Sequence, residues 1–402
     1  MWLPYATALY VDGTGDRAIL EEAAPFLRAR ALESGEDEAM VAPVRTRQHF
    51  PLYEHCCLAL DCSLAVGAHG LPLFGTGDWN DGMNRVGREG RGESVWMAFF
   101  LCAVLDGFLP HVRARNDPRA ERYARHRAEL ARAASAAGWD GGWFRRGFYD
   151  DGTPLGSREN DECRIDALVQ AWSVISNAAP RERAEAAMDA VERDLVSESE
   201  GIVRLLDPPF DRTAHDPGYI KGYVPGVREN GGQYTHAALW VARALAELGR
   251  GDRAARVLEM LSPISHARDA AGVARYRVEP YVVAADVYGS APHVGRGGWT
   301  WYTGSAGWMI RVVVESLLGV RIEGGDTLVV RPAIPRDWPG YRLELRPGGG
   351  PTRYDVRVEN SGAGGVVAEV RLDGRMLPVE RDAARIPLAE DGRTHHVLIR
   401  LE

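Results

Sequence analysis

The stretch Gly75-Thr76-Gly77-Asp78-Trp79-Asn80-Asp81-Gly82-Met83-Asn84 has a composition that neither a helix nor a regular strand accommodates. Its glycines permit positive φ and close backbone approach, and its Asp and Asn residues favour turns because their side chains bond to nearby backbone groups. The apolar run Leu71-Pro72-Leu73-Phe74 comes directly before it. The sequence therefore predicts a loop that is anchored in a core and presents two carboxylates beside an indole ring.

A carboxyl group beside an indole is one arrangement with which proteins grip a sugar and cleave or form its glycosidic bond. The indole of Trp79 would stack on the apolar face of the pyranose ring, and the carboxyl of Asp78 or Asp81 would transfer the proton. The same residues also fit a tight Asp/Asn turn with a Trp packed in the core. The stretch alone does not choose between these two interpretations.

The composition indicates an ordinary globular chain, with 402 residues of which 45% are hydrophobic and 26% charged. The length predicts two domains, or one large and one small. The formal net charge of −8 argues against a general nucleic-acid binder and against a basic membrane-surface patch. The longest apolar run, Val95 to Leu105, is too short to span a bilayer, and the N-terminus lacks the charged region of a signal peptide.

The cysteines predict reduced thiols in a cytoplasmic protein. Their number is odd, and they form no Cys-x-x-Cys pair and no His-rich group. No set of His, Cys and Asp residues has the spacing of metal ligands, so no metal site is predicted. The five positions are Cys56, Cys57, Cys62, Cys102 and Cys163.

Apolar periodicity over the first three quarters of the chain predicts helices joined by short turns and long glycine-rich loops. Residues 5–10 read as a short buried segment, a short helix follows Thr14, and residues 33–48 read as a polar loop. The long loops, around 75–91, 199–231 and 270–303, carry many of the Trp, Tyr, His and Asn residues, which favours a ring of helical hairpins with a site at one end. The predicted longer helices are 52–67, 93–109, 117–137, 162–178, 180–196, 233–249, 251–262 and 304–318.

After about residue 321 the pattern changes to short runs that alternate polar and apolar residues between Gly, Asp and Pro turns. We therefore predict a helical domain over residues 1–320 and a small β-sandwich domain over residues 321–402. The predicted strands are Thr327–Val330, Tyr341–Leu345, Tyr354–Val358, Val366–Leu372 and His396–Leu401.

Three further loop clusters offer polar groups. Residues 217–236 carry Glu229 and His236, and residues 281–299 carry Asp286. Residues 299–308, Trp-Thr-Trp-Tyr-Thr-Gly-Ser-Ala-Gly-Trp, open a helix with hydroxyls and glycines, which suits an anion cradle but lacks the lysine of a nucleotide P-loop. His236 could add a charge to a phosphate bound there, although a histidine at a helix start is as often a capping or packing residue.

The chemistry that fits these groups is inverting glycosyl transfer. A hydrolase of this stereochemistry needs an acid for the leaving oxygen and a carboxylate base for water. Phosphate as the nucleophile needs no base, so one acidic loop and one anion cradle suffice. For a hydrolase, the visible candidates for the second carboxylate are Asp286 and Glu229, and neither is compelling.

Three motifs together resemble the family 94 glycoside phosphorylases: residues 75–87, residues 228–236 and residues 299–308. The similarity is closest to the phosphorylase-like domain of cyclic β-1,2-glucan synthases and extends over essentially the whole chain. It implies an (α/α)6 barrel, incomplete at its N-terminal side, followed by a small β-domain, and the release of α-glucose 1-phosphate with inorganic phosphate as co-substrate and no cofactor. The matching positions are Asp81 for the general acid, Trp79, Arg228 and Glu229 for the sugar, and His236, Thr303 and Gly304 for phosphate.

The resemblance also implies partners and a location. Members carry an upstream Arg/Asp segment that holds the donor glucose, and its absence here predicts a fragment or a chain that needs its N-terminal portion or the membrane glycosyltransferase portion. A β-glucan and phosphate are the implied substrates, nucleic acid is not a partner, and a homodimer in the cytoplasm, with the parent protein at the inner membrane, is expected. The alternatives are a non-catalytic module that binds glucan or controls chain length, and an inverting hydrolase on an α/α barrel.

Overall fold

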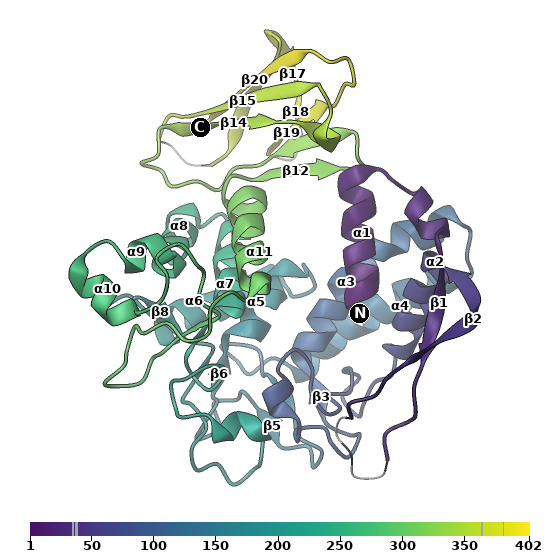
Figure 1. The fold of residues 1–402 in the computed structure, drawn as a ribbon, viewed down its shortest axis with the longest axis vertical. Helices are drawn as coiled ribbons and strands as arrows, with labels where there is room; N and C mark the ends of the chain where they lie inside the picture. The colour runs from purple at the N-terminus through teal and green to yellow at the C-terminus, as the bar shows by residue number, and fades with distance from the viewer. Residues whose placement is uncertain (34–35, 37–38, 363–364, 381) are drawn as a thin grey trace. The chain divides into compact units, whose positions relative to one another are not determined.

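The computed structural model describes residues 1–33, 36, 39–362, 365–380 and 382–402. The chain divides into two compact units. Figure 1 shows its helices and strands in chain order by colour. The change from helices to strands that the sequence predicts near residue 321 is confirmed, since β12 begins at Val320. The division of the chain into a domain 1–320 and a domain 321–402 stays a prediction. Unit 1 comprises Met1–Tyr10, Asp16–Val196 and Arg204–Gly232, and unit 2 comprises Val11–Gly15, Ser197–Val203 and Gln233–Glu402.

The helices of unit 1 form two consecutive hairpins, α3 with α4 and α5 with α6, and α3 also packs on α5. The short connections between the helices of each hairpin make the two members antiparallel neighbours. The helical segments are α1 (Trp2–Thr14, whose end belongs to unit 2), η1 (Ala18–Glu21), α2 (Leu52–Cys62), η2 (Asp81–Met83), α3 (Val95–Ala114), α4 (Arg119–Ala137), α5 (Ala167–Ile175), α6 (Arg181–Asp194) and η3 (Tyr219–Gly222).

The two members of each hairpin differ in burial because they differ in sequence. The apolar helices α3 and α5 are buried over most of their length, whereas α4 and α6 carry a charged outer face and bury only a stripe. Helix α3 extends to Ala114 and is long and apolar enough, by length and composition, to cross a membrane. Most of it is buried against its neighbours in unit 1, as in the core helix of a soluble protein.

An aromatic cluster forms the centre of unit 1. The ring of Phe100 on α3 lies 4.4 Å from Trp2 and 5.0 Å from Trp172, measured between ring centroids. Trp96 meets Trp172 edge to face at 6.3 Å, an arrangement that aromatic pairs prefer. The predicted buried segment 5–10 is thus part of a longer helix, α1, which Trp2 and Tyr5 attach to this cluster.

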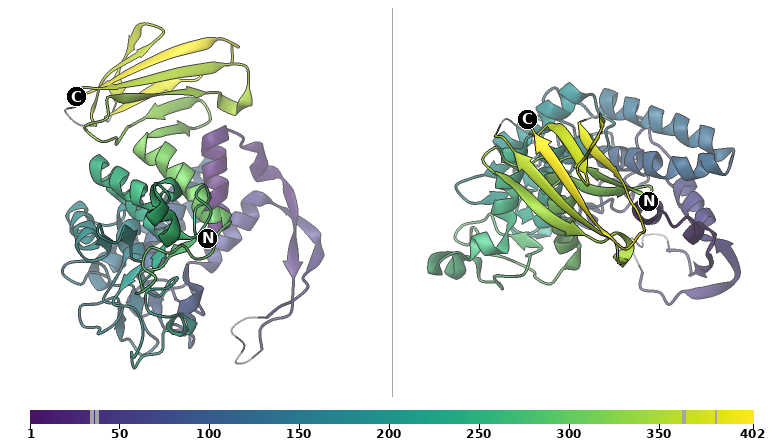
Figure 2. Two further views of the ribbon diagram at one scale, coloured as in Figure 1. Left: turned by 60° about the vertical axis from the view of Figure 1, so that its left-hand side comes forward. Right: turned by 90° about the horizontal axis from the view of Figure 1, so that it is seen from above.

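The first half of unit 1 contains a two-stranded ribbon that the sequence did not predict. Strands β1 (Ala23–Arg28) and β2 (Val44–Pro51) pair antiparallel and extend away from the helices of the unit (Figure 2). Phe26 packs on Phe50 at 5.3 Å, so the ribbon has its own small apolar contact. The short helix expected after Thr14 is present as η1. The polar loop expected over 33–48, of which residues 34, 35, 37 and 38 lie outside the described residues, is replaced by β2 from Val44 onward. The sequence of β2 gives no signal for a strand, because most of its side chains are polar and exposed and its burial does not alternate.

Very short strands lead directly into the apolar helices of unit 1. β3 (Glu93–Ser94) continues into α3, and Ser94 Oγ caps this helix by accepting the Met97 N–H. β6 (Ile165–Asp166) continues into α5 in the same way. Strands β4 (Gly147–Phe148) and β5 (Pro154–Leu155) pair with each other, and β4 also pairs with β3. Strand β9 (Leu206–Asp207) pairs with β6.

The helical part of unit 2 centres on α7, which packs against α8, α11 and η4. The end of α1 belongs to this unit because the backbone of Asp12 accepts the N–H of Gly325. The predicted long loop around 270–303 contains a further helix, α10, and the predicted helix 304–318 changes to π-helical geometry at Val312. The elements are α7 (Thr235–Glu247), α8 (Gly251–Leu261), α9 (Pro263–His266), α10 (Ala270–Tyr276), α11 (Thr303–Arg311), η4 (Val312–Leu317), β8 (Ile202–Val203), β10 (Gln233–Tyr234) and β11 (Asp286–Val287), while β7 (Val196–Ser197) lies where the units divide.

Two sheets from the C-terminal residues form a sandwich in unit 2 (Figure 2). Their strand orders are β12-β13-β19-β18 and β14-β15-β20-β16-β17, and Val, Ile and Leu residues from both sheets share one core. All five predicted strands are confirmed, and the short strands were missed. The bounds are β12 (Val320–Glu323), β13 (Thr327–Val330), β14 (Gly340–Leu345), η5 (Pro347–Gly349), β15 (Arg353–Asn360), β16 (Val367–Leu372), β17 (Arg375–Leu377), β18 (Val379–Glu380), β19 (Ala383–Pro387) and β20 (Thr394–Leu401).

The described helices therefore include three consecutive hairpins in which an apolar helix pairs with an amphipathic one: α3 with α4, α5 with α6, and α7 with α8. This is the repeating element that an (α/α)6 barrel requires. Closure of such hairpins into a ring stays a prediction.

Candidate active site

The Gly75–Asn84 loop of unit 1 has the turn geometry that its sequence predicts. Gly75 and Gly77 have φ of +64° and +136°, which side chains with a Cβ rarely adopt. Asp78 Oδ1 accepts the N–H of Asn80 at 3.0 Å, and Asn80 Oδ1 accepts the N–H of Gly82 at 3.0 Å, which caps η2. The two backbone N–H groups that flank Asp81 in sequence are therefore both held by side chains of the same loop.

The two carboxylates of the loop lie in opposite environments. The Asp78 side chain is completely buried. Its two oxygens each lie 2.5 Å from one terminal nitrogen of Arg146, and Ser94 Oγ donates to Oδ2 at 2.7 Å. Asp81 is exposed, and within the described ranges no hydrogen bond or ion pair involves its carboxylate. Only Asp81 is available to exchange a proton with a ligand.

The buried side of the loop holds a second carboxylate, Asp166. Its Oδ2 lies 3.2 Å from Arg146 Nε, and its Oδ1 accepts the N–H of Leu168 to cap α5. Burial raises the pKa of Asp166 from 3.8 to about 6, although the adjacent Arg146 opposes this shift. Burial alone would lower the pKa of Arg146, but Asp78 and Asp166 raise it, so the guanidinium stays charged.

A second segment packs against the far end of this loop. The backbone of Arg85 donates to the Pro217 carbonyl at 3.3 Å, and Asn84 Oδ1 accepts the N–H of Tyr219 at 3.1 Å. Gly218 has φ +114°, and a Cβ there would lie 2.1 Å from Asn84 Oδ1, so only glycine fits. These contacts join residues 217–222 to the loop that carries Asp81.

Arg228 and Glu229, which the resemblance assigns to the sugar, lie in the same unit as Asp81. Arg228 has φ +53°, an uncommon conformation for a residue with a side chain. Its Nε lies 3.3 Å from Glu229 Oε2, and its guanidinium covers the ring of Tyr223 at 5.0 Å. The buried Asn230 holds the segment by bonding to both backbone groups of Phe210. The pair is partly buried and fixed.

His236 lies in the first turn of α7 in unit 2, against two indoles. Its ring centroid is 4.2 Å from that of Trp240 and 5.9 Å from that of Trp308 on α11. Burial lowers the pKa of His236 from 6.5 to about 4. The imidazole is therefore neutral near pH 7 and could contribute an N–H. That His236 adds a positive charge to a bound phosphate stays a prediction.

Thr303 and Gly304 begin α11, which packs on α7 in unit 2. Both are exposed, and a Cβ built on Gly304 would have no atom within 4 Å. The side chain of Tyr302, which precedes the helix, does not cap it. Among the described residues, no side chain caps the first backbone N–H groups of α11, as an anion cradle requires. His236 lies on α7, the helix that packs against α11.

The two candidates for a hydrolytic base are both engaged. Asp286 is 1% exposed, and its Oδ1 accepts the N–H of Trp299 at 3.1 Å. Glu229 pairs with Arg228. Each carboxylate therefore has a structural partner, which disfavours a role in activating water.

Sequence reasoning missed Arg146 and Ser94, the partners of Asp78. One signal was present, because Arg146 is a charged residue in the aromatic run Trp143–Phe148, where burial requires a countercharge. The described residues contain no group of three or more His, Cys, Asp or Glu side chains that could hold a metal ion. All five cysteines are free thiols.

Residues 1–319 match the model of the Glycosyl hydrolase 94 superfamily, catalytic domain. Because this match covers most of the sequence, the chain belongs to that superfamily. It is 51% identical over 370 residues to the cyclic beta-(1,2)-glucan synthase NdvB of Rhizobium meliloti (strain 1021), which covers 92% of this chain and 13% of that protein. It is 32% identical over 405 residues to the solabiose phosphorylase of Paenibacillus borealis, covering 99% of this chain and 48% of that protein.

The chain thus spans about half or less of the length of these two relatives. Among solved structures, one titled "Sialidase" superposes with a TM-score of 0.50 at 14% identity, covering 71% of this chain and 26% of that chain. At this identity the likeness concerns the fold alone.

Proposed function

We propose that this chain is the phosphorolytic domain of a β-glucan-processing enzyme, with β-1,2-linked glucan as the substrate. The observation that carries the proposal is the contrast within one loop, where Asp78 is locked in a buried ion pair and Asp81 is exposed. A single available acid suits phosphorolysis, because phosphate is anionic and needs no base. The similarity to a cyclic beta-(1,2)-glucan synthase and to a phosphorylase supports the same class of reaction.

In the proposed reaction, Asp81 gives its proton to the glycosidic oxygen as the bond from that oxygen to C1 breaks. A phosphate oxygen attacks C1 from the opposite face, so a β-linkage gives α-glucose 1-phosphate and a glucan shortened by one unit. In the reverse direction Asp81 takes the proton of the acceptor hydroxyl. Trp79 would lie against the sugar, and Arg228 and Glu229 would bind the acceptor.

For phosphate, the proposal uses the first turn of α11 and the imidazole of His236. The open N–H groups at Thr303 and Gly304 favour an anion. A neutral His236 can donate one N–H, and a bound dianion would favour its protonated form. The same groups would be the phosphate site in either direction of the reaction.

The test uses the polypeptide encoded by the complete reading frame that contains this sequence. It is incubated with a β-1,2-linked glucooligosaccharide and inorganic phosphate, and α-glucose 1-phosphate is quantified by ³¹P NMR. Replacement Asp81→Asn should lower the rate by at least about 10²-fold, as loss of a general acid does. The matched control is Asp106→Asn on α3, whose exposed carboxylate pairs with Arg127.

Other outcomes would overturn the proposal. Free glucose without glucose 1-phosphate would indicate a hydrolase, and unchanged turnover in Asp81→Asn would remove Asp81 as the acid. Calorimetric binding of the oligosaccharide that phosphate does not affect, without any product, would indicate a glucan-binding module.

That module is the second candidate, because unit 2 exposes aromatic rings in one segment. The exposed fractions of Tyr281, Trp299 and Trp301 are 73%, 57% and 65%, and Tyr302 stacks near Trp299. Exposed indole and phenol rings are the side chains that stack on sugars.

A further inference from the structure

The exposed carboxylate of Asp81 depends on backbone contacts for its direction. No hydrogen bond or ion pair in the described part of the chain holds that carboxylate. The N–H groups of the residues before and after Asp81 are held instead, that of Asn80 by Asp78 Oδ1 and that of Gly82 by Asn80 Oδ1. The position of Asp78 therefore sets the position from which Asp81 projects.

Asp78 is in turn fixed by a residue distant in sequence. The terminal nitrogens of Arg146 meet the two oxygens of Asp78 as a parallel fork, each at 2.5 Å. This bidentate geometry fixes orientation as well as distance. Both side chains are fully buried, so water cannot substitute for either partner.

The backbone and the side chain of Arg146 both have defined neighbours. Its backbone N–H donates to the Leu155 carbonyl at 2.8 Å, and its carbonyl accepts the Val95 N–H at 3.2 Å, which ties it to the short sheet before α3. Its guanidinium lies 5.1 Å from the centre of the Phe74 ring, and Asp166 on the start of α5 lies beside Nε. Arg146 therefore connects the first residues of α3 and α5 to the loop that carries Asp78.

We propose that Arg146 is a positioning residue for Asp81: its guanidinium orients Asp78, and Asp78 orients the backbone that presents the acid. This inference rests on the proposed function, in which Asp81 protonates the leaving oxygen. Misplacement of a reacting group by about 1 Å can cost 10²-fold in rate. A loss of the fork should therefore be selective for substrates that need the proton.

The experiment compares two substrates in the phosphate-dependent reaction of the complete protein. One is a β-1,2-linked glucooligosaccharide, whose leaving group needs protonation, and the other is 2,4-dinitrophenyl β-glucoside, whose leaving group does not. Replacement Arg146→Lys keeps a positive charge and removes the fork. We expect kcat on the oligosaccharide to fall by roughly 10²-fold, with KM nearly unchanged and the rate on the aryl glucoside within a few-fold of the parent protein.

Asp78→Asn tests the same link from the other side and keeps the shape of the side chain. It should show the same selective loss, and it replaces Arg146→Lys as the decisive variant if the lysine protein does not fold. The control is Arg119→Lys, in a second Arg–carboxylate cluster of unit 1 that has no contact with the loop among the described hydrogen bonds and ion pairs. It should leave the ratio of the two rates unchanged.

The outcomes separate the inference from the function on which it rests. Equal losses on both substrates in folded Arg146→Lys and Asp78→Asn would indicate a merely structural role and overturn the inference, as would no loss on either. If Asp81→Asn itself shows no selective loss on the oligosaccharide, the proposed function fails first. A selective loss in Asp81→Asn but not in the Arg146 and Asp78 variants leaves Asp81 as the acid and removes Arg146 as its positioning residue.

Discussion

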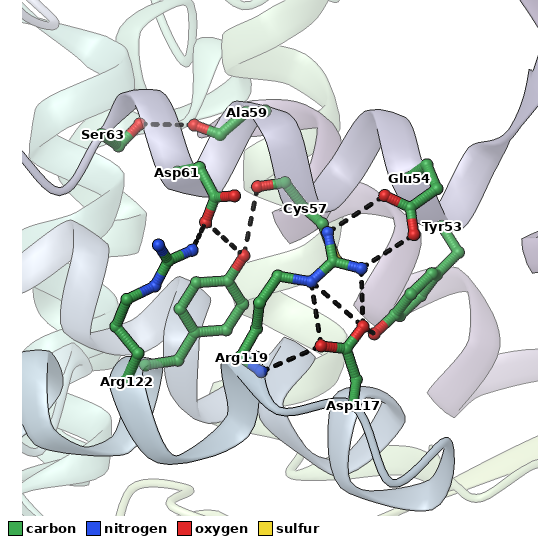
Figure 3. Close-up of polar contacts among 10 residues, drawn as sticks. Tyr53, Glu54, Cys57, Ala59, Asp61, Ser63, Asp117, Arg119 and Arg122 are labelled. Carbon is green, nitrogen blue, oxygen red and sulfur yellow. Dashed lines mark hydrogen bonds and ion pairs between the residues drawn. The ribbon is translucent and has the colours of Figure 1, made fainter.

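Two arginines of unit 1 are each held by two carboxylates, and they differ in their access to water. Arg146 lies between Asp78 and Asp166, and all three side chains are almost completely buried. Arg119, on α4, bridges Glu54 of α2 and Asp117 (Figure 3). In this second cluster the side chains are 21%, 36% and 13% exposed, respectively.

The second cluster, which is partly exposed, contains many hydrogen bonds. The Arg119 fork meets the Glu54 carboxylate at 3.0 and 2.8 Å, and Tyr53 donates to Asp117 at 2.9 Å (Figure 3). The hydrogen bonds from Arg119 hold the pKa of Asp117 well below its usual range. Water can still solvate these groups, so a lost partner is partly replaced.

The buried cluster has fewer contacts and a larger cost of disruption. Desolvation of two carboxylates and one guanidinium is expensive, and such pairs add little net stability compared with apolar packing. Removal of one partner, however, leaves an uncompensated charge. A buried Arg–carboxylate cluster therefore specifies geometry, which the loop of Asp81 needs, whereas the partly exposed cluster connects two helices.

The largest expected effect is that of Arg146→Met. This change leaves Asp78 and Asp166 buried without a countercharge, which typically costs about 3–5 kcal/mol. Urea denaturation at pH 7, followed by circular dichroism, measures the free energy of unfolding. A loss below about 1 kcal/mol would contradict the assignment of this cluster as desolvated. The triple variant Arg146→Met with Asp78→Asn and Asp166→Asn should recover part of the loss, because no buried charge remains.

The second prediction concerns pH. The pKa of Asp166 is raised by burial from 3.8 to about 6, so the folded chain binds an extra proton between these values. The resulting stability is fully present below pH 4 and is lost as the pH rises through about 6. Asp117, whose pKa is lowered, behaves in the opposite way, because its contribution is present above pH 4 and is lost as the pH falls further.

The substitution Asp166→Asn removes the pH-dependent contribution of Asp166 and leaves that of Asp117. Between pH 4 and 6 the unfolding free energy of the parent protein should fall by about 2 kcal/mol relative to that of Asp166→Asn, because the full effect is about 3 kcal/mol at roughly 1.4 kcal/mol per pKa unit and part of it lies outside this window. Denaturation series at pH 4, 5, 6 and 7 on both proteins give this difference. Identical slopes would mean that Asp166 titrates normally.

Local features of the Asp81 loop could be predicted from the sequence, and its distant partner could not. The turn at Gly75–Asn84 was predictable because glycine and Asx chemistry are local, and the choice of Asp81 as the acid came from a resemblance to known motifs. What locks Asp78 was not predictable, since Arg146 is 68 residues away. A hydrogen bond between segments that distant leaves no periodic signal.

The elements of the fold likewise differ in whether the sequence could predict them. Apolar helices such as α3 and α7 and the longer strands were predictable from their patterns, because burial requires the 3.6-residue or two-residue period. The β1–β2 ribbon was not, because its strands are largely exposed and have no two-residue alternation of buried and exposed side chains. The burial of His236 against Trp240 and Trp308, which lowers its pKa, was not predictable either, because it depends on tertiary packing.

The smallest expected effect is that of Arg119→Met. Exposed and partly exposed ion pairs are worth about 0.2–1 kcal/mol each, so a bridge between Glu54 and Asp117 should contribute about 1 kcal/mol and should weaken in salt. The free energy of unfolding at 0.05 and 1 M NaCl measures both quantities. The same salt change should leave the effect of Arg146→Met almost unaltered, because ions cannot screen a buried pair. A loss in Arg119→Met as large as in Arg146→Met, at either salt concentration, would mean that burial does not separate these two clusters.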